Sequence, residues 1–124
     1  MKQILIEKYI EPSSKENIAW FFVETWNDKY GDKHSVLGRP SAIHYENGKM
    51  VRQFWYKKGE LHRDRDLPAR IDYNSNGQIR HQYWYKKGVT HRDGALPAYI
   101  SYNSNGQIIR QSWYKNGKFI KGSL

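Results

Sequence analysis

The chain has 124 residues, no cysteine and a formal net charge of +9. This length suits one domain that buries enough surface to fold without external staples. The lack of cysteine excludes disulfides and thiolate metal sites. No stretch approaches the ~20 apolar residues of a membrane-spanning helix, and the N-terminus lacks the apolar core of a signal peptide. We therefore expect a cytoplasmic protein without membrane association, located in the host cytoplasm if its source is a phage or virus.

Aromatic residues and positive charge are the unusual parts of the composition. Aromatic side chains make up 15% of the sequence, with 10 Tyr and 5 Trp, which favours a folded core over disorder. Residues 1–34 carry five Lys/Arg and six Asp/Glu, whereas residues 35–124 carry sixteen and six. The excess positive charge therefore lies after residue 34, where we expect an acidic partner to bind.

The first 38 residues predict a degenerate hairpin that caps the fold. Residues 3–10 alternate as a strand, residues 12–17 form a polar loop, and residues 18–26 return as a second strand. The return strand ends at Trp26. Terminal units of repeat arrays are commonly atypical because they close the stack.

Residues 39–124 predict three further hairpins, which occupy 39–66, 67–95 and 96–124. A tryptophan recurs every 29 residues, at Trp26, Trp55, Trp84 and Trp113. A period of this length indicates a repeat architecture. We predict an all-β, single-domain fold, an antiparallel meander of tandem β-hairpin repeats with a 29-residue period.

Within each repeat, alternation assigns side chains to the two faces of a strand. After the proline, Ala69, Ile71 and Tyr73 share one face, while Arg70 and Asp72 share the other. Asn-Gly pairs at 47–48, 76–77 and 105–106 supply the positive φ angles of tight hairpins. The return strand alternates without interruption through two sets of residues. They are Ile79, His81, Tyr83 and Tyr85 on one face and Arg80, Gln82, Trp84 and Lys86 on the other.

The motifs Tyr-x-Asn-Gly at 45–48, Trp-Tyr-Lys-Asn-Gly-Lys at 113–118 and His-Arg-Asp-x-x-Leu-Pro-Ala at 62–69 and 91–98 resemble a known repeat group. They are similar to the MORN-like, antitoxin-type β-hairpin repeats of bacterial, phage and giant-virus proteins. The resemblance covers residues 39–121 and implies a binding or scaffolding role without catalytic residues.

The loops His62-Arg63-Asp64 and His91-Arg92-Asp93 carry the most reactive groups of the repeats. They could orient a phosphate or act in acid–base chemistry. Because the tripeptide recurs in step with the fold, we expect His62, Asp64, His91 and Asp93 to be structural, like the four tryptophans. The histidines stand one repeat apart, which is not the spacing of metal ligands. We predict no metal and no cofactor.

The predicted function is a non-enzymatic binding or inhibitor module, such as a phage or viral accessory protein. Its basic, aromatic-rich repeat face would engage an acidic protein surface. The residues expected to contact the partner are Arg52, Lys57, Lys58, Arg80, His81, Lys86, Lys87 and Arg110.

Two alternatives remain open. Trp-Tyr-Lys-Lys at 55–58 and 84–87 combines stacking surfaces with cations, as in single-stranded nucleic-acid-binding proteins. The second alternative is an enzyme that uses one of the His-Arg-Asp loops. For the oligomeric state, we expect either a monomer or a homodimer paired through a sheet edge.

Overall fold

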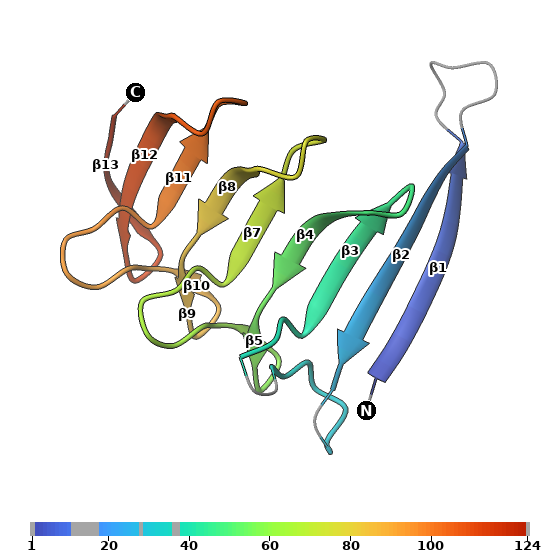
Figure 1. Cartoon of the computed structure of the whole chain (residues 1–124). Coiled ribbons are helices and arrows are strands. Elements are labelled where there is room, and N and C mark those ends of the chain that lie inside the picture. The colour runs from blue at the N-terminus through green and yellow to red at the C-terminus, as the bar shows by residue number, and fades with distance from the viewer. Residues whose placement is uncertain (1, 11–17, 28, 36–37, 124) are drawn as a thin grey trace.

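The computed structural model describes residues 2–10, 18–27, 29–35 and 38–123, with side chains described from residue 27 onward. Nine strands form one antiparallel sheet in which each strand neighbours the next in chain order (Figure 1). These strands are β1 (Lys2–Ile10), β2 (Ile18–Trp26), β3 (Ala42–Glu46), β4 (Lys49–Phe54), β7 (Arg70–Tyr73), β8 (Ile79–Tyr83), β11 (Tyr99–Tyr102), β12 (Ile108–Lys115) and β13 (Lys118–Ser123).

Two small sheets branch from the main one. One pairs β5 (Tyr56–Lys57) with β6 (Glu60–Leu61), and the other pairs β9 (Tyr85–Lys86) with β10 (Val89–Thr90). Figure 1 shows both beyond the ends of the main strands that lie opposite the hairpin turns. The prediction of an all-β, antiparallel protein is confirmed, and no helix able to cross a membrane occurs among the described residues.

The two strands predicted in the N-terminal segment are confirmed by β1 and β2, which pair along their full length. The loop predicted at 12–17 and the side chain of Trp26 lie outside what the structure describes. β2 also pairs with β3, so this first pair of strands continues directly into the main sheet.

The hairpin turns are of two kinds, which corrects the sequence prediction. At 47–48 both residues have positive φ, +50° and +80°, as in a two-residue turn. At 76–77 only Gly77 does, and the Gly77 amide donates to Asn74, whose own amide donates to Gln78. One more residue in this loop allows a turn closed by a left-handed glycine, and the same bonds recur at 103–107.

A β-bulge in β8 overturns part of the predicted alternation. Asp72 pairs with His81, but Tyr73 pairs with Ile79, so Arg80 has no partner across the strands. A bulge places two residues opposite one and shifts the alternation by one position. Ile79 therefore lies opposite Tyr73 rather than on the face of His81, and simple alternation could not reveal this.

The return strands β4 and β8 are also shorter than predicted, because the chain leaves the main sheet at Trp55 and Trp84, whereas β12 continues through Trp113 to Lys115. The amide of Trp84 donates to the carbonyl of Ala98, while the Trp84 carbonyl accepts from the amide of His91. Trp55 makes the same two bonds, to Ala69 and His62. Tyr85 and Lys86 consequently belong to a small sheet, not to β8.

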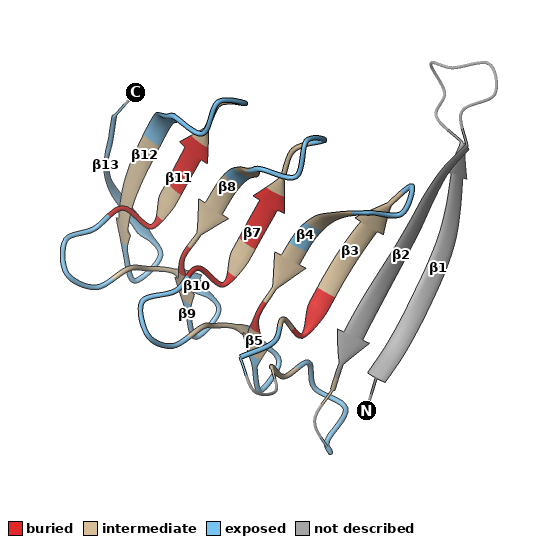
Figure 2. Cartoon of the chain, in the orientation of Figure 1, coloured by how far each residue is buried: buried red, intermediate tan, exposed pale blue. Residues whose placement is uncertain are grey.

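The buried residues lie on β7 and β11, at the start of β3 and in the short segments next to these strands (Figure 2). Trp84 is 6% exposed and clusters with Ala98 and Ile100 of the next hairpin. Trp55 is 4% exposed. Few large apolar side chains are buried among the residues whose side chains the structure describes, so we expect these indoles to contribute a large share of the hydrophobic stabilisation there.

Replacing Trp84 should therefore destabilise the fold. We expect Trp84→Ala to lower the free energy of unfolding by about 3–5 kcal/mol, measured by urea denaturation. Trp84→Phe keeps an aromatic ring but loses the indole N–H donor, and should cost roughly 1–3 kcal/mol. A Trp84→Ala protein as stable as the wild type would contradict this account of the core.

Candidate functional site

Two arginines cover the buried tryptophans. The Cζ atom of Arg63 lies 3.8 Å from the ring centre of Trp55, and that of Arg92 lies 3.9 Å from the ring centre of Trp84. Each arginine also donates from Nη1 to the carbonyl of the proline five residues further along, at 3.1 and 3.0 Å. The long connections thus seal the tryptophan face with cation–π contacts, which strengthen where water is excluded.

Three tryptophans, the two covered ones and Trp113, each donate the indole N–H to a backbone carbonyl in the connection that precedes their hairpin. We call the residue that supplies this carbonyl the acceptor position. The bonds join Trp55 to Gly38 (3.0 Å), Trp84 to Asp66 (3.1 Å) and Trp113 to Ala95 (3.1 Å). All three acceptor residues have positive φ, from +55° to +74°.

At one acceptor position the side chain makes a second link. Asp66 accepts from Nε and Nη2 of Arg92 at 2.9 and 3.2 Å, so both carboxylate oxygens are bound. A two-pronged arginine–carboxylate pair adds geometric specificity to the attraction of opposite charges. Asp66 therefore holds Trp84 through its carbonyl and Arg92 through its side chain.

The histidines of the His-Arg-Asp loops tie each connection to the next turn. Nδ1 of His62 accepts from the amide of Lys87 at 3.2 Å, and its Nε2 lies 2.7 Å from Asp64. Because an amide N–H can only donate, Nδ1 is unprotonated and Nε2 donates to the carboxylate. This hydrogen bond lowers the pKa of Asp64. With both ring nitrogens engaged, the geometry supports a structural role.

The same tie recurs at other positions. His91 accepts from the amide of Asn116 at 2.9 Å and binds Asp93 at 2.7 Å, which lowers the pKa of Asp93. His34 accepts from the amide of Lys58 at 3.2 Å. These ties align the turns at 57–59, 86–88 and 115–117, which stand two strands apart, or about 10 Å.

The aligned turns carry a row of cations. We call it the lysine-turn row, and it consists of Lys57, Lys58, Lys86, Lys87 and Lys115, all exposed. The first lysine of each pair lies near an exposed aspartate, with Lys57–Asp64 at 4.0 Å and Lys86–Asp93 at 3.5 Å. Contacts of this kind between exposed groups are weak. Much of the charge is therefore available to a partner.

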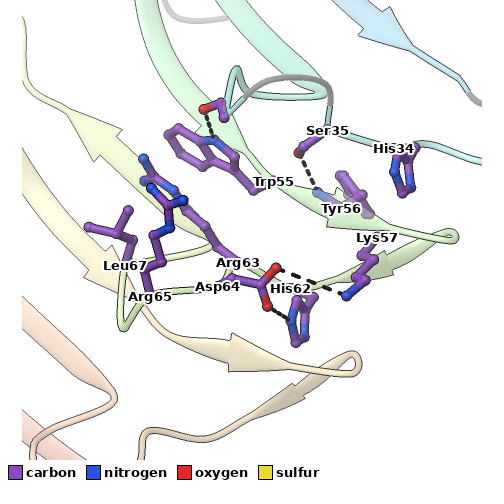
Figure 3. Close-up of a pocket in the computed structure, with 11 residues that line it drawn as sticks. His34, Ser35, Trp55, Tyr56, Lys57, His62, Arg63, Asp64, Arg65 and Leu67 are labelled. Carbon is purple, nitrogen blue, oxygen red and sulfur yellow. Dashed lines mark hydrogen bonds and ion pairs between the residues drawn. The ribbon is translucent and has the colours of Figure 1, made fainter.

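A cleft of about 510 Å³ opens between the first two long connections (Figure 3). Trp55 and Arg63 line it together with Lys57, His62 and Arg65. The Ser35 hydroxyl, from the earlier connection, accepts from the Tyr56 amide at 3.2 Å. Asp64 also lines the cleft, but it is bound to His62 and lies 4.0 Å from Lys57. The cations outnumber it, so the lining suits an anionic group.

The opposite face of the sheet holds a separate charged cluster around Asp72, whose side chain is 11% exposed. Arg70 donates to both of its oxygens at 2.9 and 3.0 Å, and Nδ1 of His81 lies 3.2 Å away. Nε of Arg52 lies 3.8 Å from the same carboxylate. Two arginines and a histidine thus converge on a single carboxylate.

The residues predicted to bind a partner therefore fall into separate groups. Arg52 and His81 converge on Asp72, whereas Arg110 is exposed on β12. Arg80 is exposed in the bulge of β8. The lysines Lys57, Lys58, Lys86 and Lys87 lie together in the lysine-turn row. No group of three or more metal-ligating side chains occurs in the described part of the chain.

Sequence reasoning missed two features of these sites. The first is the clamp on Asp72, which alternation could have indicated because Arg70 and Asp72 share a face. The second is the contact of Arg63 and Arg92 with the tryptophans, for which the sequence gives no local signal. No protein-family model, curated protein or solved structure matches the chain. The resemblance to MORN-like repeats stays a prediction.

His44 also lies on the Asp72 face, with its ring 4.9 Å from that of Phe54. Burial lowers the pKa of His44 below its usual 6.5, and the nearby charges of Arg52, Lys33 and Arg70 lower it further. A histidine with a lowered pKa takes up a proton more readily in the unfolded chain than in the folded one. It therefore favours folding above pH 6.5, and this contribution is lost as the pH falls.

The wild type should lose more stability than His44→Gln between about pH 7.5 and pH 5, because only the wild type carries this titrating group. Urea midpoints of both proteins at the two pH values measure the difference. The remaining histidines are common to both proteins and serve as the internal control. Equal losses in the two proteins would show that His44 is not perturbed.

Proposed function

We propose that this protein is a non-enzymatic binding module that engages an acidic protein surface through the lysine-turn row. The row is exposed, positively charged and held in place by two backbone ties at each turn. Cationic rows of this kind steer an acidic partner and select against basic ones. We further propose that the fold is a tandem array of 29-residue hairpin repeats, which sets the spacing of the row.

The observation that carries the proposal is the backbone of Lys58 and Lys87. Both have φ of +50°, in the left-handed region, where an L-residue other than Gly, Asn or Asp is strained. The corresponding residue of the third turn is Asn116, also at +50°. Asparagine would adopt this conformation with less backbone strain, so we infer that the lysines have a role other than forming the turn.

The side-chain charges of these two lysines also support the proposal. In the part of the chain that the structure describes, neither Lys58 nor Lys87 forms an ion pair with an acidic side chain. Each instead uses its backbone amide to bind a histidine. The turn is therefore held by the backbone, and the ammonium group is left for a partner.

A protein partner fits the aromatic residues better than a nucleic acid does. Stacking by bases requires accessible rings, whereas Trp55 and Trp84 are 4% and 6% exposed and are covered by Arg63 and Arg92. The cations alone would bind any polyanion. Measuring the affinities of an acidic peptide and a nucleic acid side by side therefore distinguishes the two kinds of partner.

Fluorescence anisotropy with a labelled oligo-glutamate peptide and a labelled oligo-dT strand of equal charge makes this comparison. We expect the peptide to bind more tightly at low salt and to be released as salt rises. Tighter binding of oligo-dT, or no binding of the peptide at low salt, would overturn the proposal.

Lys58→Asn combined with Lys87→Asn should weaken peptide binding by about fivefold or more at low salt. The same double variant should unfold at a higher urea concentration, by up to about 1 kcal/mol per site, because the strain is relieved. Asn116→Lys is the reciprocal control and should bind more tightly while losing stability. Unchanged binding in the double variant would show that the lysines have no role in recognition.

A further inference from the structure

The two covered tryptophans differ in one respect. At Trp84 the acceptor position holds Asp66, whose carboxylate binds Nε and Nη2 of Arg92. At Trp55 the acceptor position holds Gly38, which has no side chain. Arg63, the counterpart of Arg92, therefore lacks the carboxylate that its neighbour has.

Everything else about Arg63 matches Arg92. Its Cζ lies 3.8 Å from the Trp55 ring centre, against 3.9 Å for Arg92 and Trp84. Its Nη1 donates to a proline carbonyl at 3.1 Å, against 3.0 Å. The guanidinium group of Arg63 is thus held in the same orientation as that of Arg92 by the same two contacts. Its Nε and Nη2 have no carboxylate partner among the described residues.

The position beside Arg63 that corresponds to the Asp66 carboxylate beside Arg92 opens on the cleft of about 510 Å³ that Arg63 and Trp55 line. Partial burial lowers the pKa of the Arg63 guanidinium, as expected for a cation removed from water without an anion beside it. Arg65, Lys57 and Asp64 line the same cleft, so that with Arg63 it holds three cations and one carboxylate. A Cβ atom built on Gly38 would meet no heavy atom within 4 Å, so there is room beside it.

We propose that this cleft is a carboxylate-binding site, in which Arg63 receives one Asp or Glu side chain of the protein partner through Nε and Nη2, over the face of Trp55. The Asp66–Arg92 pair within the same chain shows the geometry of the bound state. The proposal deepens the proposed function and rests on it for the identity of the partner. The lysine-turn row attracts the acidic surface, and the Arg63 cleft fixes one carboxylate of it.

The first test supplies the missing carboxylate within the chain. Gly38→Asp places it beside Arg63, at the position equivalent to that of Asp66 beside Arg92. Gly38→Ala is the matched control, because Ala95 shows that alanine can occupy an acceptor position, at φ +56°. We expect the folding equilibrium constant of Gly38→Asp to exceed that of Gly38→Ala by about threefold to tenfold. This advantage should vanish when Arg63→Gln is added to both. No advantage with Arg63 present would overturn the inference.

The second test uses the labelled oligo-glutamate peptide. Arg63→Gln and Gly38→Asp should each weaken its binding by about tenfold, and the two together by no more than either alone, because both close the same site. Gly38→Ala should bind as the wild type does. Arg80→Gln removes the same charge far from the cleft and should have a smaller effect than Arg63→Gln.

The outcomes separate this inference from the proposed function. Peptide binding that depends on Lys58 and Lys87 but not on Arg63 would leave the proposed function standing and overturn the carboxylate site. Failure of the peptide to bind, together with a stabilising Gly38→Asp, would support the carboxylate site and overturn the proposed function.

The small anions acetyl-aspartate amide and methyl phosphate then define the chemistry of the site. The ¹⁵N–¹H signal of Arg63 Nε should shift with acetyl-aspartate amide in the wild type and not in Gly38→Asp. A stronger response to methyl phosphate would overturn the assignment to a protein carboxylate and would indicate a phosphate-bearing partner.

Discussion

The structure depends on the contact between each arginine and the tryptophan beneath it. A single nine-stranded sheet has two faces to cover, and among the side chains that the structure describes few large aliphatic ones are buried. It covers Trp55 and Trp84 with the guanidinium groups of Arg63 and Arg92, whose Cζ atoms lie 3.8 and 3.9 Å from the ring centres. Because these arginines lie on the long connections, the same contact that buries the tryptophans also fixes the connections to which the turns of the lysine-turn row are bound.

That coupling explains why the lysine-turn row can present charge in an ordered way. The connections that contain Arg63 and Arg92 are each bound by the indole of the following hairpin, by the arginine's bond to a proline carbonyl, and by a histidine that accepts from the next turn. The connection that contains Gly38 has the indole and histidine bonds. The turns therefore follow the spacing of the strands. An extended acidic segment would meet cations at regular intervals, and one anchoring cleft would set its register.

Much of the fold could be predicted from the sequence, because strands are specified by local patterns. Alternation and the Asn-Gly turns indicated an antiparallel all-β protein, and the residues of β1 and β2 were located within one position. The bulge at Arg80 and the end of β8 before Trp84 could not be predicted, since both depend on hydrogen bonds to other strands and loops. For the site, the lysines were recognisable as exposed turn residues. The missing carboxylate beside Arg63 was not recognisable, because it appears only when the acceptor positions Gly38 and Asp66 are compared in the structure.

The exchange rates of the indole N–H protons test the central claim most directly. In a protein labelled with ¹⁵N-tryptophan, the account predicts slow exchange with solvent for the Nε1 protons of Trp55 and Trp84, assigned by single Trp→Phe variants. Substitution of Arg92 by Ala should accelerate exchange at Trp84 and leave Trp55 protected. Fast exchange at both indoles in the wild-type protein would contradict the claim that the arginine-covered tryptophans hold the connections to the sheet.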